Sequence, residues 1–341
     1  MIKGIFTLTC LVIGLAAGRL PAAEHPQAEI SNSQIHATVY LPDAGKGYYR
    51  GTRFDWSGVV GALKFKGHNY YGPWFQRMDP KVYDFVYDGP DIIASTCSAI
   101  TGPVEEFAAL GYDQAKPGDT FIKIGVGVLR KPRQTAYDAF YTYEIADPGK
   151  WTVRKGPGWI EFTQEISDKS GYAYLYRKTV RLSKDKPEMI LEHSLRNTGR
   201  RRIETSAYDH NFLVLDKQPP GPDFVVAFPF EIRTDRPPDK DLAEIRGNQI
   251  VYLKTLADKD RVMTAVQGFS NSPKDYDIRI ENRRVGAGMR IRGDRPLSKE
   301  SFWSIRSVLC AEPFVAITIE PGSEFTWRLT YNFYTLPVKS Q

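Results

Sequence analysis

The sequence near the C-terminus runs Ser307-Val-Leu-Cys-Ala-Glu-Pro-Phe-Val-Ala-Ile-Thr-Ile-Glu-Pro-Gly-Ser-Glu-Phe-Thr-Trp-Arg-Leu-Thr-Tyr-Asn-Phe-Tyr334. Apolar residues alternate with polar ones on both sides of Pro321-Gly322, which predicts two strands joined by a turn as a hairpin. Glu312 interrupts the first strand. Burying a carboxylate without a partner is costly, so we expect Glu312 to point into a cleft, where it can act as a general base.

Most of the remaining chain alternates in the same way, and helical periodicity is scarce. A helical turn is expected at Glu105–Leu110, and residues 298–309 have some helical spacing although their composition favours a strand. A succession of strands without alternating helices predicts an all-β chain of large antiparallel sheets packed as a sandwich in one domain, residues 24–341. The expected strands are His36–Tyr40, Val59–Phe65, Val82–Tyr87, Phe121–Leu129, Phe140–Ile145, Trp151–Arg154, Trp159–Ile166, Tyr172–Leu182, Met189–Arg196, Ile203–Tyr208, Phe224–Phe228, Ile250–Leu253, Val262–Val266, Tyr276–Ile280 and Gly288–Arg292.

The first 23 residues have the pattern of a secretory signal peptide. Lys3 gives a positive start, Gly4–Ala17 an apolar run, and Ala22-Ala23 a small-residue cleavage site. The apolar run is short for a membrane-spanning helix. We therefore expect export to a bacterial periplasm, or secretion, with no integral membrane segment after cleavage; an uncleaved anchor is the alternative.

Composition excludes several classes of protein. Apolar residues make up 42% of the chain and aromatic residues 13%, which fits a folded globular protein and not a disordered one. The net charge of +6 is spread along the chain apart from Arg200-Arg201-Arg202, and no nucleic-acid-binding module accompanies it, so no nucleic-acid partner is expected. No Cys/His cluster has zinc spacing, so no metal is expected. Cys97 and Cys310 fit either a disulfide or two buried thiols.

A second informative segment ends in Tyr208-Asp209-His210-Asn211, after a strand, an Asn-Thr-Gly turn and another strand. A histidine at a strand end can act as a general acid near neutral pH, and Asp209 could keep it charged. The alternative for His210 is a hydrogen-bonded structural histidine. His193, inside the preceding strand, has no polar neighbours of this kind and is expected to be structural.

Together these motifs resemble the galactose mutarotase (aldose 1-epimerase) superfamily over most of the mature chain. Leu195–Gly199 and His210–Phe212 stand where that family has an Asn-x-Gly turn and its catalytic histidine. Leu309–Glu312 matches the segment with the catalytic glutamate. Ile319–Glu324 and Thr330–Phe333 match the Pro-Gly turn and the final strand.

Further points of the resemblance concern the N-terminal half. Gly51–His68 looks like the family's opening hairpin, and Gly102–Phe107 stands where relatives have a further histidine that this chain lacks. The resemblance implies a β-supersandwich with its site on a concave face. It also implies that Glu312 is the base and His210 the acid of a sugar ring-opening reaction that uses no metal or organic cofactor.

Sugar sites commonly combine charged clamps with aromatic platforms. On that basis the candidates for substrate contacts are Arg53, Asp55, Trp74, Glu106, Lys123, Asp209 and Asn211. The predicted function is an aldose 1-epimerase-like protein that binds a sugar or oligosaccharide. Two alternatives stay open: a carbohydrate-binding protein without turnover, and a glycoside-cleaving enzyme that pairs Glu106 with Glu312.

Overall fold

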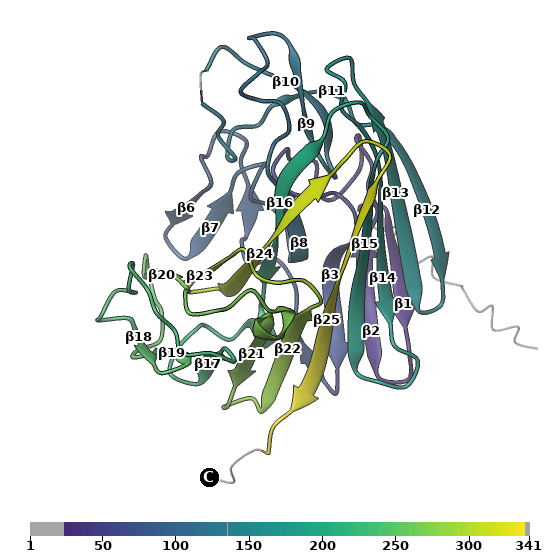
Figure 1. The fold of residues 1–341 in the computed structure, drawn as a ribbon. Helices are drawn as coiled ribbons and strands as arrows, with labels where there is room; N and C mark the ends of the chain where they lie inside the picture. The colour runs from purple at the N-terminus through teal and green to yellow at the C-terminus, as the bar shows by residue number, and fades with distance from the viewer. Residues whose placement is uncertain (1–23, 135, 338–341) are drawn as a thin grey trace, which may run out of the picture.

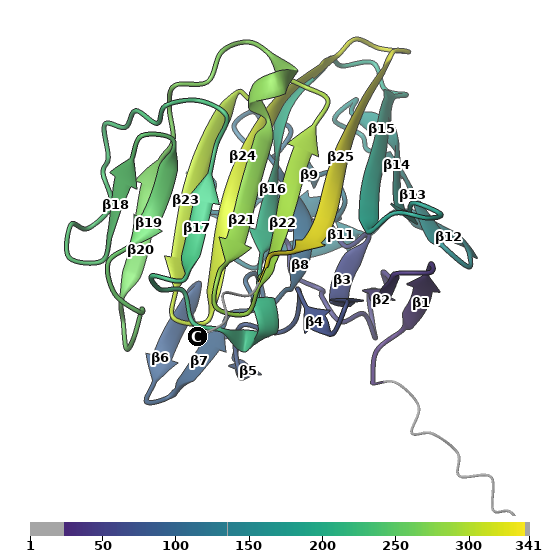
Figure 2. The same cartoon turned by 90° about the horizontal axis from the view of Figure 1, so that it is seen from below.

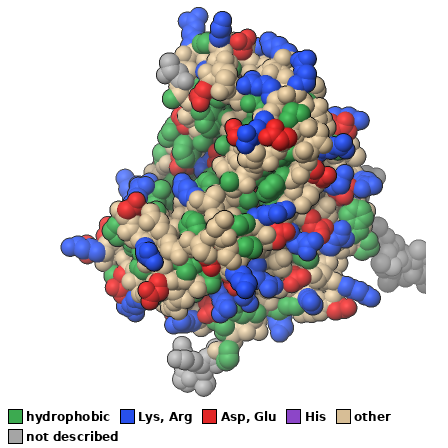
Figure 3. Space-filling view, viewed as in Figure 1, with side chains coloured by type: hydrophobic (Ala, Val, Ile, Leu, Met, Phe, Trp, Pro, Cys, Tyr) green, Lys and Arg blue, Asp and Glu red, His purple; other side chains and the backbone are tan. Residues whose placement is uncertain are grey.

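The structure is a computed structural model that describes residues 24–134 and 136–337 (Figure 1). The predicted signal peptide lies outside the described residues. Strands dominate because β-branched and aromatic residues alternate with polar ones along most segments. Within the described ranges no helix is long and apolar enough to cross a membrane. Charges of both signs are mixed over the face drawn in Figure 3.

A ten-stranded antiparallel sheet forms one layer of the molecule. Its strands, in spatial order, are β12 (Lys150–Gly156), β13 (Trp159–Ser167), β14 (Ala173–Leu182), β15 (Glu188–Asn197), β25 (Glu324–Thr335), β22 (Ala287–Gly293), β21 (Asp277–Asn282), β17 (Phe224–Ala227), β19 (Gln249–Tyr252) and β18 (Ala243–Arg246). This sheet confirms the predicted architecture of large antiparallel sheets.

A five-stranded antiparallel sheet packs against this layer. Its strands, in spatial order, are β20 (Arg261–Ala265), β23 (Lys299–Ile305), β24 (Val308–Ile319), β16 (Ile203–Phe212) and β8 (Gly102–Phe107). Figure 2 shows strands of both sheets running along roughly the same line, as aligned sandwich packing requires. One face of the smaller sheet is therefore turned toward the large sheet, and its other face is left for a site.

Three small sheets and two short 3-10 helices complete the described chain. They are β1 (Gln27–Ser31), β2 (Ile35–Tyr40), β3 (Val59–Phe65) and β4 (His68–Asn69); β9 (Thr120–Lys123), β10 (Gly127–Arg130) and β11 (Glu144–Asp147); β5 (Arg77–Met78), β6 (Phe85–Asp88) and β7 (Asp91–Ala94); and η1 (Leu215–Lys217) and η2 (Pro273–Asp275). Residues from these sheets and from the outer face of the five-stranded sheet form a second hydrophobic cluster.

The two C-terminal strands do not form the predicted hairpin. β24 belongs to the five-stranded sheet and β25 to the large one, so Pro321-Gly322 carries the chain from one layer to the other. The Asn197-Thr-Gly turn makes the same crossing between β15 and β16. Buried Asn197 joins the two crossings, because its carbonyl accepts from the Gly322 amide (2.9 Å) and its side chain donates to the Ile319 carbonyl (3.0 Å).

Several local predictions were also wrong, among them the expected strand Phe140–Ile145, of which only Glu144 and Ile145 belong to a strand, β11. The expected helical turn at Glu105–Leu110 begins as strand β8, in which every residue is buried. The expected strand Phe121–Leu129 is a hairpin of β9 and β10, because Gly125 at its turn has a φ of +77°, a value that favours glycine. A Cβ at Gly125 would also lie 2.5 Å from the Asp55 carboxylate.

Polar residues lie buried between the two main sheets. Glu105 of β8 contacts His193 of β15 (2.7 Å) and forms a salt bridge with Lys178 of β14. The His193 ring stacks on Trp327 of β25, with ring centroids 4.4 Å apart. These groups connect the layers, which agrees with the structural role expected for His193. Away from this cluster, Cys97 and Cys310 are buried free thiols.

Candidate functional site

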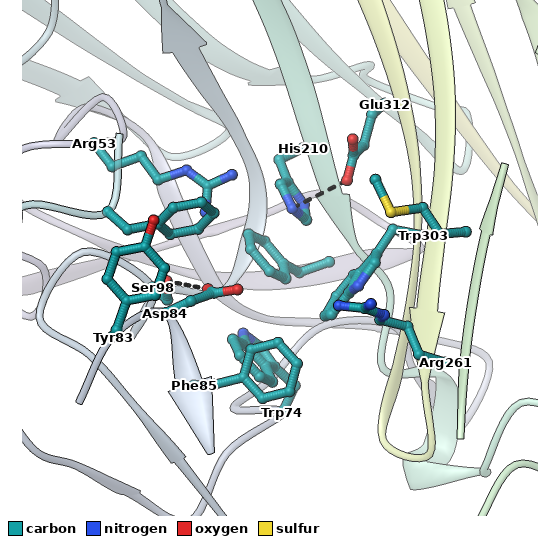
Figure 4. A pocket seen from close by; sticks show the side chains of 13 residues that line it. Arg53, Trp74, Tyr83, Asp84, Phe85, Ser98, His210, Arg261, Trp303 and Glu312 are labelled. Atoms are coloured by element: carbon teal, nitrogen blue, oxygen red, sulfur yellow. Dashed lines mark hydrogen bonds and ion pairs between the residues drawn. The ribbon is translucent and has the colours of Figure 1, made fainter. Parts of the chain in front are cut away.

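A cavity of about 360 Å³ opens on the face of the five-stranded sheet that is turned away from the large sheet (Figure 4). This volume is within the range of small-molecule sites, roughly 300–1,000 Å³. One wall of the cavity is formed by β16, β24, β23 and β20 of the five-stranded sheet. The opposite wall is formed by loops together with β6. The lining residues are Arg53, Trp74, Tyr83, Asp84, Phe85, Ser98, Phe140, His210, Phe212, Arg261, Met263, Trp303 and Glu312.

His210 and Glu312 lie next to each other on one side of this cavity. Tyr208 of β16 lies opposite Phe314 of β24, and Leu213 lies opposite Leu309, so the register brings His210 alongside Glu312. The His210 Nε2 atom lies 3.3 Å from Glu312 Oε1. The side chains are 6% and 16% exposed, which leaves the pair reachable from the cavity but poorly hydrated.

The environment shifts both pKa values so that the uncharged form of each side chain is favoured. Burial raises the pKa of Glu312 to about 7, against the opposing effect of the Arg53 charge. Burial, and then repulsion by Arg53, lowers the pKa of His210 well below 6.5. The prediction of a charged histidine is therefore wrong. Below about pH 7 the proton of this pair resides on Glu312 and His210 is neutral.

Aromatic side chains hold the His210 ring in place. Phe212 stacks on it with ring centroids 3.8 Å apart, and Phe54 meets it edge-on at 5.5 Å. Trp303 of β23 lies edge-on at 6.0 Å. The His210 Nδ1 atom has no hydrogen-bond partner among the described residues. Packing, more than hydrogen bonding, fixes this ring and directs Nε2 toward Glu312.

Arg53 reaches the cavity from the loop between β2 and β3. Its Nε donates to Glu106 (2.7 Å) and its Nη2 donates to the Tyr208 hydroxyl (2.8 Å). Its guanidinium also stacks over Phe140, with Cζ 4.5 Å from the ring centroid. Arg53 therefore presents a positive charge of fixed orientation to the cavity, as its predicted role requires.

Glu106 and Lys123 stand behind Arg53 and do not line the cavity. Lys123 is fully buried and donates to Glu106 (3.1 Å). Glu106 also accepts from Arg53 and from the Tyr208 hydroxyl (2.6 Å). A carboxylate held by three donors is poorly suited to general acid–base chemistry, so the predicted pairing of Glu106 with Glu312 for glycoside cleavage lacks its geometry.

Three predicted contact residues point away from the cavity. Neighbouring residues of a strand face opposite sides, so Asp209 and Asn211 must turn inward when His210 turns outward. Both accept a hydrogen bond from the Tyr331 hydroxyl on the large sheet. Asp55 is also fully buried between the layers. The prediction that Asp209 holds a charged His210 therefore fails, and none of the three is assigned a binding role.

Trp74 lines the cavity as predicted, and Asp84 lines it without having been predicted. The Trp74 ring stacks parallel to Phe212 at 5.7 Å. Asp84 has a φ of +54° and accepts a hydrogen bond from the Ser98 hydroxyl (2.7 Å). The sequence signal for Asp84 was an acidic residue inside the alternating segment Val82–Tyr87.

The fold is shared with solved structures of low sequence identity. A GalM/aldose epimerase homologue from C. elegans is 14% identical with a TM-score of 0.52, covering 91% of this chain and 99% of that one. A galactose mutarotase-like protein from Clostridium acetobutylicum is 12% identical with a TM-score of 0.51, covering 90% and 95%. The Slr1438 protein from Synechocystis sp. PCC 6803 is 13% identical with a TM-score of 0.52, covering 93% and 98%.

Sequence comparison alone does not detect these relationships. No protein-family model matches the chain, and no curated protein matches it. The similarity covers nearly the whole length of the solved structures. It confirms the fold that the motifs predicted: the chain has the galactose mutarotase-like β fold, as a divergent example.

Proposed function

We propose that this protein is an aldose 1-epimerase-like enzyme that interconverts sugar anomers by opening and closing the pyranose ring. The observation that carries the proposal is the His210–Glu312 pair, 3.3 Å apart in the lining of a cavity with aromatic walls. The reaction needs one group that accepts a proton and another that donates one, and no further catalytic group from the protein.

The pKa directions assign the roles within the pair. Glu312, with its raised pKa, gives its proton to the ring oxygen while the bond from that oxygen to the anomeric carbon breaks. Neutral His210 takes the proton of the anomeric hydroxyl through Nε2, and the carbonyl of the open-chain aldehyde forms. Rotation about the adjacent carbon–carbon bond and reversal of both transfers close the ring as the other anomer. This assignment reverses the roles that the family resemblance implied.

Two further residues support sugar binding at this cavity. Trp74 offers an aromatic surface to the apolar face of a pyranose, and Arg53 offers a fixed donor to its hydroxyl groups. We also propose that the enzyme acts after export, because residues 1–23 have the pattern of a cleaved signal peptide.

The test is the rate of anomer exchange in freshly dissolved α-sugars, followed by polarimetry across a panel of hexoses and pentoses. The wild-type chain should accelerate exchange of at least one sugar. Glu312→Gln should reduce that acceleration roughly 10²–10⁴-fold, the usual contribution of a general acid or base. Glu204→Gln, an exposed glutamate of the same strand pair, is the matched control and should keep wild-type activity. No acceleration of any sugar by the wild type would refute the proposal.

A further inference from the structure

A second cleft adjoins the first cavity on the side away from the catalytic pair. Its volume is about 390 Å³, close to that of the first. The two share Tyr83, Asp84, Phe85 and Arg261, and the second adds Tyr87 and Lys259. Figure 4 shows Asp84 and Arg261 on the opposite side of the first cavity from Glu312. The two spaces therefore adjoin at these shared residues.

The second cleft has two cationic groups, of which Arg261 interacts electrostatically with Asp84 at the junction of the two spaces. Lys259 and Arg261 are both exposed, and within residues 24–134 and 136–337 neither forms a salt bridge or a side-chain hydrogen bond. The acidic residue between them, Asp260, does not neutralise them, because its carboxylate contacts Lys254 (3.2 Å) and accepts from the Ala257 amide (3.0 Å). A ligand with a negative group would find two available cations there.

Two more features suit a bound saccharide. The Tyr87 hydroxyl is buried and has no hydrogen-bond partner in the described chain, so a ligand oxygen could satisfy it. At the junction of the two spaces, Tyr83 is 62% exposed and forms an aromatic platform at the rim. Asp84 lies at the same junction, where its carboxylate can accept from sugar hydroxyls.

We propose that the natural ligand is an acidic oligosaccharide that spans both spaces. The inference rests on the proposed function, since only the reducing-end unit of a glycan has a free anomeric hydroxyl for His210 and Glu312. That unit would occupy the first cavity, and the rest of the oligosaccharide must extend out of it. The second cleft then receives the next unit, whose carboxylate or sulfate contacts Lys259 and Arg261.

The test compares binding of matched disaccharides by tryptophan fluorescence, with Trp74 and Trp303 as reporters. The probes are glucuronosyl-glucose against cellobiose, and galacturonosyl-galactose against galactobiose. At least one acidic disaccharide should bind roughly tenfold more tightly than its neutral partner. The preference should shrink as NaCl rises from about 0.05 to 0.5 M, because salt screens exposed charges.

Substitutions show which residues cause the preference for acidic disaccharides. The double variant Lys259→Met/Arg261→Met should remove it, and Lys274→Met, at an exposed lysine that does not line the cleft, should retain it. Equal binding of acidic and neutral members in every pair would overturn the inference. So would free glucuronate or galactose 6-phosphate binding as tightly as the acidic disaccharide. A preference that holds without anomer exchange would support the cleft assignment while refuting the epimerase proposal.

Discussion

Two histidine–glutamate pairs lie on opposite sides of the five-stranded sheet. His193 and Glu105 are 2.7 Å apart in the layer between the two main sheets, where Lys178 also binds the carboxylate. His210 and Glu312 are 3.3 Å apart on the other face, at a cavity. The residue types are the same, so the chemistry of each pair is decided by what surrounds it.

The difference is visible in the pKa values of the two glutamates. Burial acts to raise the pKa of both carboxyls. Lys178 and His193 overcome that effect for Glu105, whose pKa falls to about 2, whereas the pKa of Glu312 rises to about 7. Glu105 is thus held as a permanent anion that connects the layers. Glu312 exchanges its proton near neutral pH, as a general acid must.

The largest expected contrast concerns stability. Glu105→Gln removes the nearer of the two buried carboxylates that pair with Lys178 and leaves only Asp55, 3.8 Å from Nζ, so the free energy of unfolding should fall by about 3 kcal/mol. Glu312→Gln removes a carboxyl that burial disfavours, so it should be neutral or stabilising at pH 8. Urea denaturation of both variants measures the contrast. Equal losses in the two variants would show that the pairs do not differ in this way.

The pH dependence of stability should differ in sign between the two glutamates. The pKa of Glu312 is raised above its ordinary value of 4.5, so its contribution to stability is complete below that value and is lost as pH rises through about 7. The loss is on the order of 3 kcal/mol. Glu105 has a lowered pKa, so its contribution is complete above 4.5 and is lost as pH falls toward 2.

Denaturation from about pH 4.5 to 8.5 tests the Glu312 part of this contrast. Wild-type stability relative to Glu312→Gln should decrease across that range. A stability difference between the two that does not change with pH would show that the pKa of Glu312 is not raised.

The smallest expected effect concerns the inner histidine. His193→Phe keeps the stack on Trp327 and loses the hydrogen bond to Glu105, which should cost about 2 kcal/mol, the usual value for a bond to a charged group. Thermal unfolding measures the cost. A shift in the unfolding temperature no larger than that caused by a substitution at an exposed position would mean that the inner pair does not connect the layers.

The strands were predictable because they depend on local alternation. Val59–Phe65 was predicted with its observed bounds, and nine strands of the large sheet lie within two residues of their predicted ends, whereas β18 was not predicted. The sheet to which a strand belongs was not predictable. Pro321-Gly322 and Asn197-Thr-Gly have ordinary turn sequences, and the same sequences serve a hairpin or a crossing between layers, because the choice depends on distant partners.

The candidate site was predictable only in part. Glu312 and His210 were visible because each breaks an apolar pattern. The same alternation could have excluded Asp209 and Asn211, since the neighbours of an outward residue face inward. Arg261 has no comparable signal: it lies on the short edge strand β20, and only the tertiary fold brings it to the cavity.

The most direct test of the central claim is the anomer-exchange rate of His210→Phe beside His193→Phe, measured by NMR exchange spectroscopy on the sugar that the wild type uses best. Phenylalanine keeps an aromatic ring for the stacking at both positions and removes the imidazole nitrogen atoms. We predict that folded His210→Phe loses roughly 10²–10⁴-fold of the wild-type acceleration. Folded His193→Phe should stay close to wild type. Wild-type activity in His210→Phe, or an equal loss in the two variants, would contradict the account.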